Sequence, residues 1–557
     1  MLDMQALRIQ DFKALSASAM AELAAAMRSQ LIAQDAQIHT ACGQLAERDR
    51  AIKFKDAKIE RITFELARLK AWKFGARTEA MNAQQRQMFE DTLAEDQASL
   101  EAQLQMLQGQ SQQSEQSEAP ASDSKRRPRR QALPEHLRRV EHHHEPEDTT
   151  CPSPDCGHPM TRIGEDVSER LDIVPAEFFV HRHIRGKWVC KCCQQKGEGR
   201  LVQEPVDPQI IDKGMPTSGL LAHTLVSRFV DHLPYYRQEQ INARSGVHTP
   251  RSTLAAWSGA AGASLLPLYD AQREFVLGAA VLHADETPVR VLDPGAGKTA
   301  RAYVWAYARG EHDPIPGVIY EFCGGRGSKY PNDFLARWLG TLTCDDYKGY
   351  DIIFKREGRI EAGCLAHARR KFDELAKADA SPVAAQAIGR IARIYKVEAR
   401  ARSMTPDERL AYRREHGQPL WDELHAWLQL ERRDELHAWL QLERSRVADG
   451  GGIAAAIDYS LRRWKALGRF LKDGAVSVDN NHVENLMRPW AVGRKSWLFA
   501  GSELAGQRAA MVMSLVQSAK LNGHDPWVYL TDVLERLLAH KRHRLGELLP
   551  HRWSPLS

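Results

Sequence analysis

The first hundred residues carry apolar side chains at helical spacing. An apolar residue recurs at every seventh position from Leu31 to Leu66. A sustained seven-residue repeat predicts a coiled coil, which would join chains into a homo-oligomer. Arg48 and Lys55 interrupt the second seam, so one amphipathic helix packed on its own protein is the alternative. We therefore expect residues 1–107 to form a helical, coiled-coil region.

A polar stretch of low complexity follows this region. The sequence QGQSQQSEQSEAPASDS cannot bury enough apolar surface to fold, and the basic block KRRPRR comes directly after it. Residues 108–134 are thus predicted to be a disordered basic linker. The block is either a solvated tail or a segment that follows DNA phosphates, and we expect the second role for Lys125, Arg126, Arg127, Arg129 and Arg130.

Alternation with a period of two then predicts a hairpin in RLDIVPAEFFVHRHIRGKWVC (170–190), which cysteines flank on both sides. Four thiolates brought together suit one tetrahedral, structural Zn²⁺ ion. The spacing favours Cys151, Cys156, Cys190 and Cys193 as its ligands. Cys192 or His158 could replace one of them, and a few buried thiols without metal are the alternative. Residues 135–205 form this zinc-binding region, in which EHHHE (141–145) is expected to be solvated.

Helical spacing returns in residues 217–258, which predict three short helices. Pro234 opens the second helix, and Gly246 suits its C-terminal end. A trihelical unit with a turn before its last helix is typical of a helix-turn-helix, although a plain helical connector has the same pattern. We assign residues 206–262 to this unit and expect Arg251 to contact DNA.

From residue 278 the pattern predicts strands again. AAVLHADETPVRVL, RAYVWAYA and GVIYEF read as three strands, NDFLARWLG as a short helix, and LTCDDYKGY and RIEAGCL as two further strands. This order predicts a mixed sheet with helices packed on it. Alternation places Asp285 on the apolar face of its strand and Glu286 on the other, where it is solvated or paired with a basic side chain.

Acidic side chains from separate elements could meet at the end of this sheet. Asp285 lies within the first strand, Asp345 follows the fourth, and Glu484 lies on a predicted helix far downstream. Hard oxygen ligands suit Mg²⁺, and two such ions can activate a nucleophile and stabilise the leaving oxygen of a phosphodiester. Ordinary strand-end acids are the alternative. Basic residues near Glu484 are expected to contact DNA phosphates: Arg488, Arg494 and Lys495.

Composition narrows the class of protein only slightly. The net charge of +5 is too small to identify a partner, and 43% hydrophobic residues suffice for real cores. No apolar run approaches the ~20 residues that a membrane span needs. No signal peptide is visible at the N-terminus, so we expect a cytoplasmic protein with reduced thiols and no membrane partner.

The set of motifs resembles the transposases of bacterial insertion-sequence family sixty-six. The resemblance is carried by HADETPV, CDDYKGY, GCLAHARRKF, NNHVENLMRPWAVGRKSWLFAGS and SAKLNGHDPWVYL, and it extends from LKAWKFGARTEAM nearly to the C-terminus. It implies a multidomain α+β protein with a helical N-terminus, a zinc-binding region, a helix-turn-helix and a ribonuclease H-like catalytic core. It also implies an Asp–Asp–Glu triad, which by motif is Asp285, Asp345 and Glu484, and small companion proteins encoded by the same element.

The sequence departs from the family pattern at two places. Asp346 stands where a small residue is usual, and residues 422–445 contain DELHAWLQLERR followed by DELHAWLQLERS. Cys364 and His367 match a Cys-x-x-His signature of such proteins, for which we favour simple packing over metal binding. We divide the remaining chain into a first part of the core (263–375), a helical insertion (376–470), a second part with the glutamate helix (471–515) and a C-terminal helical region (516–557).

These observations predict a DNA transposase. Its reaction would be metal-dependent hydrolysis at the element's ends, followed by attack of the freed 3′ hydroxyl on target DNA. Two alternatives belong to other classes: a zinc-containing DNA-binding regulator without catalysis, and a ribonuclease H-like nuclease that cuts without joining. A pure regulator has no use for three carboxylates beside basic helix residues, whereas a strand-transfer assay separates the nuclease from the transposase.

Overall fold

The structure, a computed structural model, describes residues 55–56, 58–63, 65–67, 83–112, 133, 135, 137–146, 148–150, 159–174, 177–190, 201–293, 298–379, 381–442, 452–497 and 500–555. Most of the predicted heptad lies outside these residues, and so does the basic block at 125–130. Helix α3 (Ala83–Gln112) runs past residue 107, where we expected the linker to begin. Glutamine propagates a helix well, and the single Gly109 does not end it.

The predicted hairpin is present and longer than expected. Strands β2 (Thr161–Val174) and β3 (Glu177–Val189) pair antiparallel, and β4 (Leu201–Val202) pairs with the end of β3. The segment 141–145 is solvated on one side only: Glu141, His143 and Glu145 are exposed, and the two histidines between them are half-buried. Strand β1 (Arg138–His144) pairs parallel with β3, so that His142 and His144 stack on the imidazoles of His181 and His183. Alternation over only a few histidines is too short to predict such a strand.

Four helices follow the hairpin sheet: α5 (Ser218–Phe229), α6 (Tyr235–Arg244), α7 (Arg251–Ser264) and α8 (Leu266–Leu277). The first three match the predicted helices. Thr217 caps α5 by accepting the backbone N–H of Leu220, and Gly246 has a φ of 78° after α6. A left-handed residue at this position favours glycine, which explains the end of α6.

The second sheet has five strands and the predicted order along the chain. Its strands are β5 (Val281–Asp293), β6 (Lys298–Arg309), β7 (Val318–Cys323), β8 (Gly340–Cys344) and β9 (Arg359–Gly363). In space the order is β7-β6-β5-β8-β9, with β5 in the centre. The pairs β5–β6 and β6–β7 are antiparallel, whereas β5–β8 and β8–β9 are parallel.

Two boundaries around β8 differ from the prediction. The short helix α9 (Lys329–Phe334) begins and ends earlier than NDFLARWLG suggested. Strand β8 ends at Cys344, because the carboxylate of Asp345 accepts the backbone N–H of Tyr347 and turns the chain. A short 3-10 helix (Lys348–Tyr350) follows. Side chains of this kind compete with strand pairing, which ends the strand at its acid.

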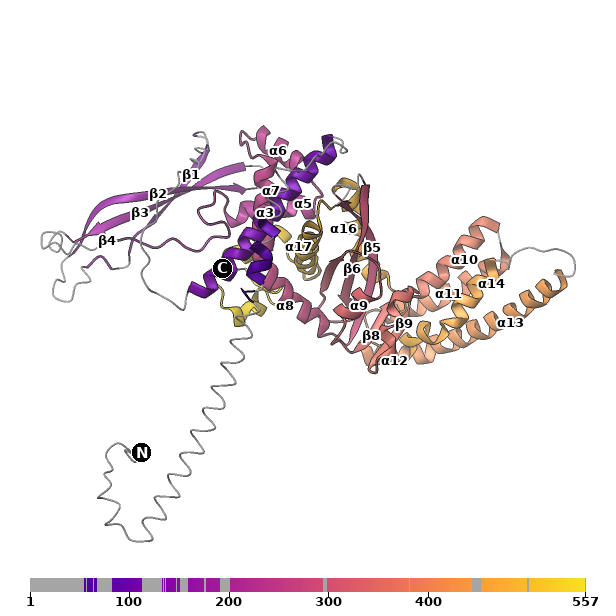
Figure 1. The fold of residues 1–557 in the computed structure, drawn as a ribbon. Coiled ribbons are helices and arrows are strands. Elements are labelled where there is room, and N and C mark those ends of the chain that lie inside the picture. Colours follow the sequence, from indigo (N-terminus) through magenta and orange to yellow (C-terminus); the bar gives the residue numbers. More distant parts are fainter. Residues whose placement is uncertain are drawn as a thin grey trace, which may run out of the picture. The chain divides into compact units, whose positions relative to one another are not determined.

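Helix α17 (Glu503–Leu521) packs on the edge strand β7 and lies beside the five-stranded sheet (Figure 1). The hydroxyls of Ser514 and Ser518 accept the backbone N–H groups of Tyr320 and Val318 at 2.8 and 3.1 Å. Edge strands normally leave such backbone donors without a partner. The two serine hydroxyls supply acceptors for them and so align the helix along the strand. At Gly506 an added Cβ would come within 2.5 Å of the Phe322 ring, so only glycine permits this approach.

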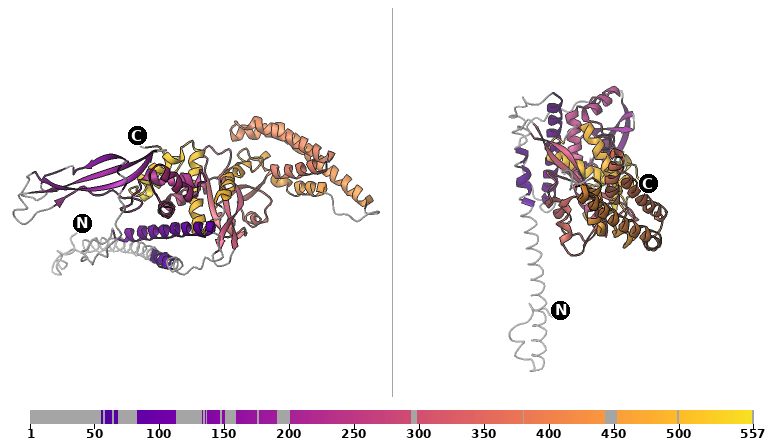
Figure 2. Two further views of the ribbon diagram at one scale, coloured as in Figure 1. Left: turned by 90° about the horizontal axis from the view of Figure 1, so that it is seen from above. Right: turned by 90° about the vertical axis from the view of Figure 1, so that its right-hand side faces the viewer.

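A helical insertion connects β9 to the last helices. Its main helices are α10 (Leu365–Asp379), α11 (Pro382–Ala401), α12 (Pro406–Tyr412), α13 (Gln418–Leu442) and α14 (Gly452–Arg462). Helices α10, α11, α13 and α14 pack on one another, which Figure 2 shows from two directions. Helix α13 runs without a break through the junction of the repeated twelve residues. Leu424 and Leu428 of the first copy are buried.

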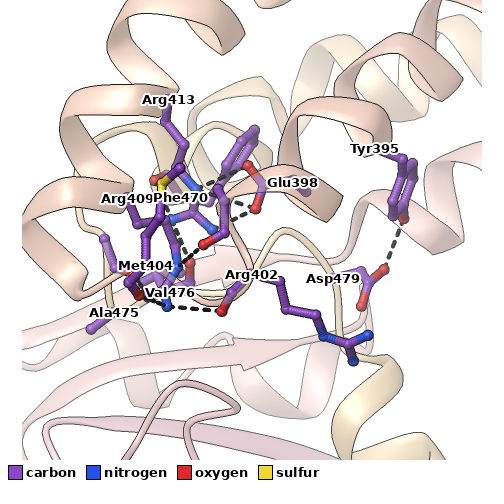
Figure 3. Close-up of polar contacts among 12 residues, drawn as sticks. Tyr395, Glu398, Arg402, Met404, Arg409, Arg413, Phe470, Ala475, Val476 and Asp479 are labelled. Atoms are coloured by element: carbon purple, nitrogen blue, oxygen red, sulfur yellow. Dashed lines mark hydrogen bonds and ion pairs between the residues drawn. The ribbon is translucent and has the colours of Figure 1, made fainter.

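Two buried arginines tie the insertion to the chain that leads into helix α16 (Asn481–Trp497). Arg413 is fully buried, forms an ion pair with Glu398 at 2.6 Å and donates to the carbonyls of Phe470, Asp473 and Val476. Arg409 donates to the carbonyl of Gly474 at 2.6 Å. These contacts, drawn in Figure 3, fix the loop that precedes α16. The insertion is therefore part of the support of that helix.

Helix α3 is anchored by a buried ion cluster. Arg508 of α17 lies 2.5 Å from Glu95 and 3.1 Å from Asp96, and all three side chains are at most 6% exposed. Burial is the main cause of the raised pKa of Asp96, and the neighbouring charge of Glu95 adds to it. The positive charge of Arg508 opposes this shift.

Among the described residues, no helix is long and apolar enough to cross a membrane.

Candidate catalytic site

Asp285 lies in the central strand β5 and Asp345 directly after β8. The parallel register pairs Val281 with Thr341 and His283 with Thr343. The same offset of sixty residues sets Asp285 opposite Asp345, just past the last paired residues. Parallel partners share a face of the sheet, so the pairing brings the first two predicted acids together.

The neighbours of these acids are engaged elsewhere. Asp346 forms an ion pair with Arg463 of the insertion, which also binds Glu361 at 2.5 Å. Glu286 is 1% exposed and accepts hydrogen bonds from Arg326 at 2.5 Å and Tyr350 at 2.9 Å. Glu286 is thus the salt-bridged neighbour that the sequence allowed, and it is not solvated. Burial and the charge of Asp345 raise the pKa of Glu286 to about 6, although Arg326 opposes the shift.

Sequence reasoning missed Arg326. This residue lies in the loop after β7, where no motif or periodicity marks it. Its guanidinium stacks over the ring of Tyr347 at 3.9 Å while it binds Glu286. The tyrosines of CDDYKGY were the available signal, because an arginine is a frequent partner of an aromatic face beside a carboxylate.

Glu484 reaches the same region from the first turn of α16. The start of this helix is fixed by Asn480, which is 1% exposed. The side-chain amide of Asn480 donates to the carbonyl of Ala284 at 2.8 Å, and its oxygen lies 2.9 Å from Nδ1 of His283. Asn480, the residue before the helix of Glu484, is therefore bonded to His283 and Ala284, which directly precede Asp285. Asn480 is a second residue that sequence reasoning missed.

Asp285 is affected by its burial and by the other acids of this region. Burial raises the pKa of Asp285 to about 8, and the charges of Glu286, Glu484 and Asp345 add to the shift in that order. Arg326 bonds to Glu286, and Arg370 lies 3.8 Å from Glu484. The carboxylates come from a strand, the end of a strand and a helix, and the positive side chains nearby do not prevent the raised pKa of Asp285. Such a cluster fits a divalent cation with oxygen ligands.

The predicted basic residues of α16 have different environments. Arg494 donates to the hydroxyl of Thr287 and the carbonyl of Pro288, each at 3.2 Å, so it holds α16 against β5. Arg488 and Lys495 are exposed. Arg251 begins α7 and is half-buried. The basic residues from Lys125 to Arg130 lie outside the described part of the chain.

Of the predicted zinc ligands, the structure describes Cys190 alone. This residue is 1% exposed and packs with Met160, Trp188 and Val202 at the end of the hairpin. Cys151, Cys156 and Cys193 lie outside the described residues, as do Cys192 and His158. The placement of the complete ligand set stays a prediction.

Comparison with known proteins identifies the family. Residues 213–508 match the Transposase IS66 family, and residues 514–551 match the IS66 C-terminal element. The chain belongs to the IS66 transposase family. Residues 148–194 match the zinc-finger binding domain of transposase IS66, and residues 61–141 match Transposase C of IS166 homeodomain. The predicted resemblance is confirmed.

Relatives in Sinorhizobium fredii (strain NBRC 101917 / NGR234) are similar over most of their length. The uncharacterized protein y4qI is 34% identical over 529 residues, which is 92% of this chain and 92% of that protein. The uncharacterized protein y4jD is 35% identical over 433 residues, covering 76% of this chain and 81% of that protein. Membership of this transposase family implies DNA binding, a divalent metal in the catalytic region and zinc in the finger region.

The cysteine assignment predicts a measurable loss of zinc. The double variant Cys151→Ser/Cys190→Ser is expected to bind about one zinc fewer per chain than the parent, because each half of the site loses a thiolate. Zinc contributes directly to the folding of small units, so protection of the hairpin from proteolysis should fall as well. Elemental analysis measures the loss, and Cys42→Ser, outside the matched finger, is the control. Freshly purified parent protein without any zinc contradicts the assignment.

Proposed function

We propose that this protein cleaves DNA at the ends of an insertion sequence and joins the freed ends to target DNA. One observation carries the proposal: the parallel pairing of β5 with β8 runs as far as His283 and Thr343, so Asp285 and Asp345 follow at neighbouring positions. The charges of Glu484 and Asp345 add to the raised pKa of Asp285, which supports a common site. The strand order β7-β6-β5-β8-β9, with a central strand bearing the first acid, supports a ribonuclease H-like core. The insertion between β9 and α16 supports the same assignment.

Each acidic residue has a distinct role in this proposal. Asp285, Asp345 and Glu484 would hold two Mg²⁺ ions, which activate the attacking oxygen and stabilise the leaving oxygen when bound. We do not assign Asp346 as a metal ligand, because it forms an ion pair with Arg463. Arg326 neutralises Glu286, which keeps that carboxylate aligned beside the site. Asn480 and Arg494 hold α16 on β5 and so fix the direction of Glu484.

Basic residues would place the DNA. Arg488 and Lys495, exposed on the helix of Glu484, would bind phosphates next to the scissile bond, while the block from Lys125 to Arg130 would add affinity without sequence preference. We assign α5, α6 and α7 to a helix-turn-helix that reads the terminal repeats, with Arg251 at the start of its last helix. The protein would act in the cytoplasm as a homo-oligomer, together with companion proteins of its element.

A joining assay tests this function. Purified full-length protein is incubated with Mg²⁺, a linear DNA that carries the repeats flanking its gene, and a target plasmid. We expect nicks that expose a 3′ hydroxyl at the repeat ends and covalent joints to the plasmid. DNA with scrambled ends is the control. Cutting without joints would instead identify a nuclease, and binding without either product would identify a regulator.

A further inference from the structure

A second cluster of ligating side chains lies beside the acidic site. Cys364 precedes α10, His367 lies in its first turn, and Glu484 lies in the first turn of α16. One donor atom from each lies within 4.8 Å of the other two, and no other set of three in the described part of the chain meets this limit. The acids Asp285 and Asp345 are not members of the set.

The side chain of Cys364 receives two backbone hydrogen bonds. Its Sγ accepts the backbone N–H of Asn480 at 3.2 Å, and the backbone N–H of His367 also bonds to it. Burial raises the pKa of the Cys364 thiol, and these two donors oppose that shift. Backbone donors aimed at sulfur stabilise a negative charge on it, as they do at the N-termini of helices with reactive cysteines.

The two atoms at which His367 and Glu484 face each other are buried and make no hydrogen bond. His367 Nδ1 and Glu484 Oε1 lie 3.5 Å apart, and neither atom has a hydrogen-bond partner. Buried polar atoms are nearly always satisfied, so two orphaned atoms that face each other require an explanation. Arg370 lies 3.8 Å from the other carboxylate oxygen, Oε2, and does not reach Oε1. An ion between the imidazole and Oε1 would satisfy both atoms.

We propose that Cys364, His367 and Glu484 form a transition-metal site of the Zn²⁺ type, distinct from the cysteine finger. A thiolate, an imidazole and a carboxylate are a donor set that zinc accepts, whereas Mg²⁺ does not bind sulfur. Ligand atoms about 2.0–2.3 Å from one zinc ion lie about 3–4 Å apart, so small side-chain adjustments close the site. Binding releases the thiol proton of Cys364 to solvent.

The shared carboxylate gives this site a consequence for the proposed acidic site. Zinc bound through Oε1 would fix the rotamer of Glu484 and leave Oε2 for the acidic cluster. The surroundings are already rigid, since Asn480 bonds to Cys364, to Ala284 and to His283. Only this consequence rests on the proposed function, because zinc binding at the cluster requires neither DNA nor cleavage.

Zinc stoichiometry of the full-length protein tests the site. Parent and variants are dialysed against the same free zinc concentration and analysed for bound metal. Cys364→Ser and His367→Asn are each expected to bind one zinc fewer per chain than the parent, with an affinity at this site at least about 100-fold lower. Cys323→Ala, which removes another buried thiol outside the cluster, should match the parent. Cobalt substitution should show a thiolate absorption that Cys364→Ser reduces.

The use of two variants keeps the test valid if one of them does not fold. His367 is partly exposed, so His367→Asn decides the outcome if Cys364→Ser does not fold. Equal zinc in the parent and His367→Asn overturns the proposal, and so does an equal loss in Cys323→Ala. A protein that binds the extra zinc but does not join DNA would retain this site while refuting the proposed function, so the two failures are distinguishable.

Discussion

Asp285→Asn and Glu484→Gln are each expected to lower Mg²⁺-dependent cleavage of element ends by at least about 1000-fold, with DNA binding unchanged. Each change replaces an anionic oxygen ligand by a neutral amide of the same shape. The positions on β5 and on the first turn of α16 keep their packing, so the fold and the helices that we propose to bind DNA should persist. Cleavage of labelled end DNA measures the first effect, and a gel-shift titration measures the second.

Neighbouring acids provide the matched comparison. Asp345→Asn should lose cleavage like the other two, whereas Asp346→Asn should retain it within a few-fold. The reason is that Asp346 is 53% exposed and pairs with Arg463, so it contributes charge at the rim of the site. Wild-type cleavage by Asp285→Asn, or loss in Asp346→Asn without loss in Asp345→Asn, would show that the acids have been assigned wrongly.

The second large effect concerns the stability of the insertion. Arg413→Ala is expected to lower the free energy of local opening of α12 and α13 by about 3–5 kcal/mol, because it leaves the carboxylate of Glu398 buried without its partner. Three carbonyls before α16 also lose their donor. Amide hydrogen exchange in these helices should become about two to four orders of magnitude faster.

Two further variants show whether charge pairing is the cause. Arg414→Ala removes the exposed neighbour and should change the opening free energy by no more than about 0.5 kcal/mol. The double variant Arg413→Met/Glu398→Met should recover part of the loss, because the unpaired charge is gone while the three carbonyls still lack a donor. Unchanged exchange in Arg413→Ala would mean that this cluster does not hold the insertion to the glutamate helix.

Much of the catalytic region could be predicted from the sequence because its signals are local. The alternation around Asp285 and the acid after Cys344 specify strands and their ends, and the five strands are found in the predicted order. Glu484 was predicted only through the family resemblance, because no periodic pattern links it to Asp285 and Asp345 so far back in the chain. The arrangement of strands in space, with β5 at the centre, follows from pairing between residues far apart in the chain.

The missed residues share a physical cause. Arg326 and Asn480 act through contacts with residues 40 and 197 positions away, and no local pattern of the sequence specifies such pairs. The histidines of β1 read as a solvated run because the strand they pair with, β3, is not adjacent in the chain. For Cys364 and His367 the spacing was visible, but no pattern in the sequence indicated that Glu484 lies beside them.

The cluster of Glu95, Asp96 and Arg508 has a consequence for synthesis on the ribosome. Asp96 and Arg508 are 412 residues apart, so the two acids emerge long before their partner. At about 5–20 residues per second, the interval is about 20–80 s. During that time α3 carries two carboxylates whose buried partner has not yet been synthesised. A product truncated before Arg508 would therefore lack the ion cluster that anchors α3.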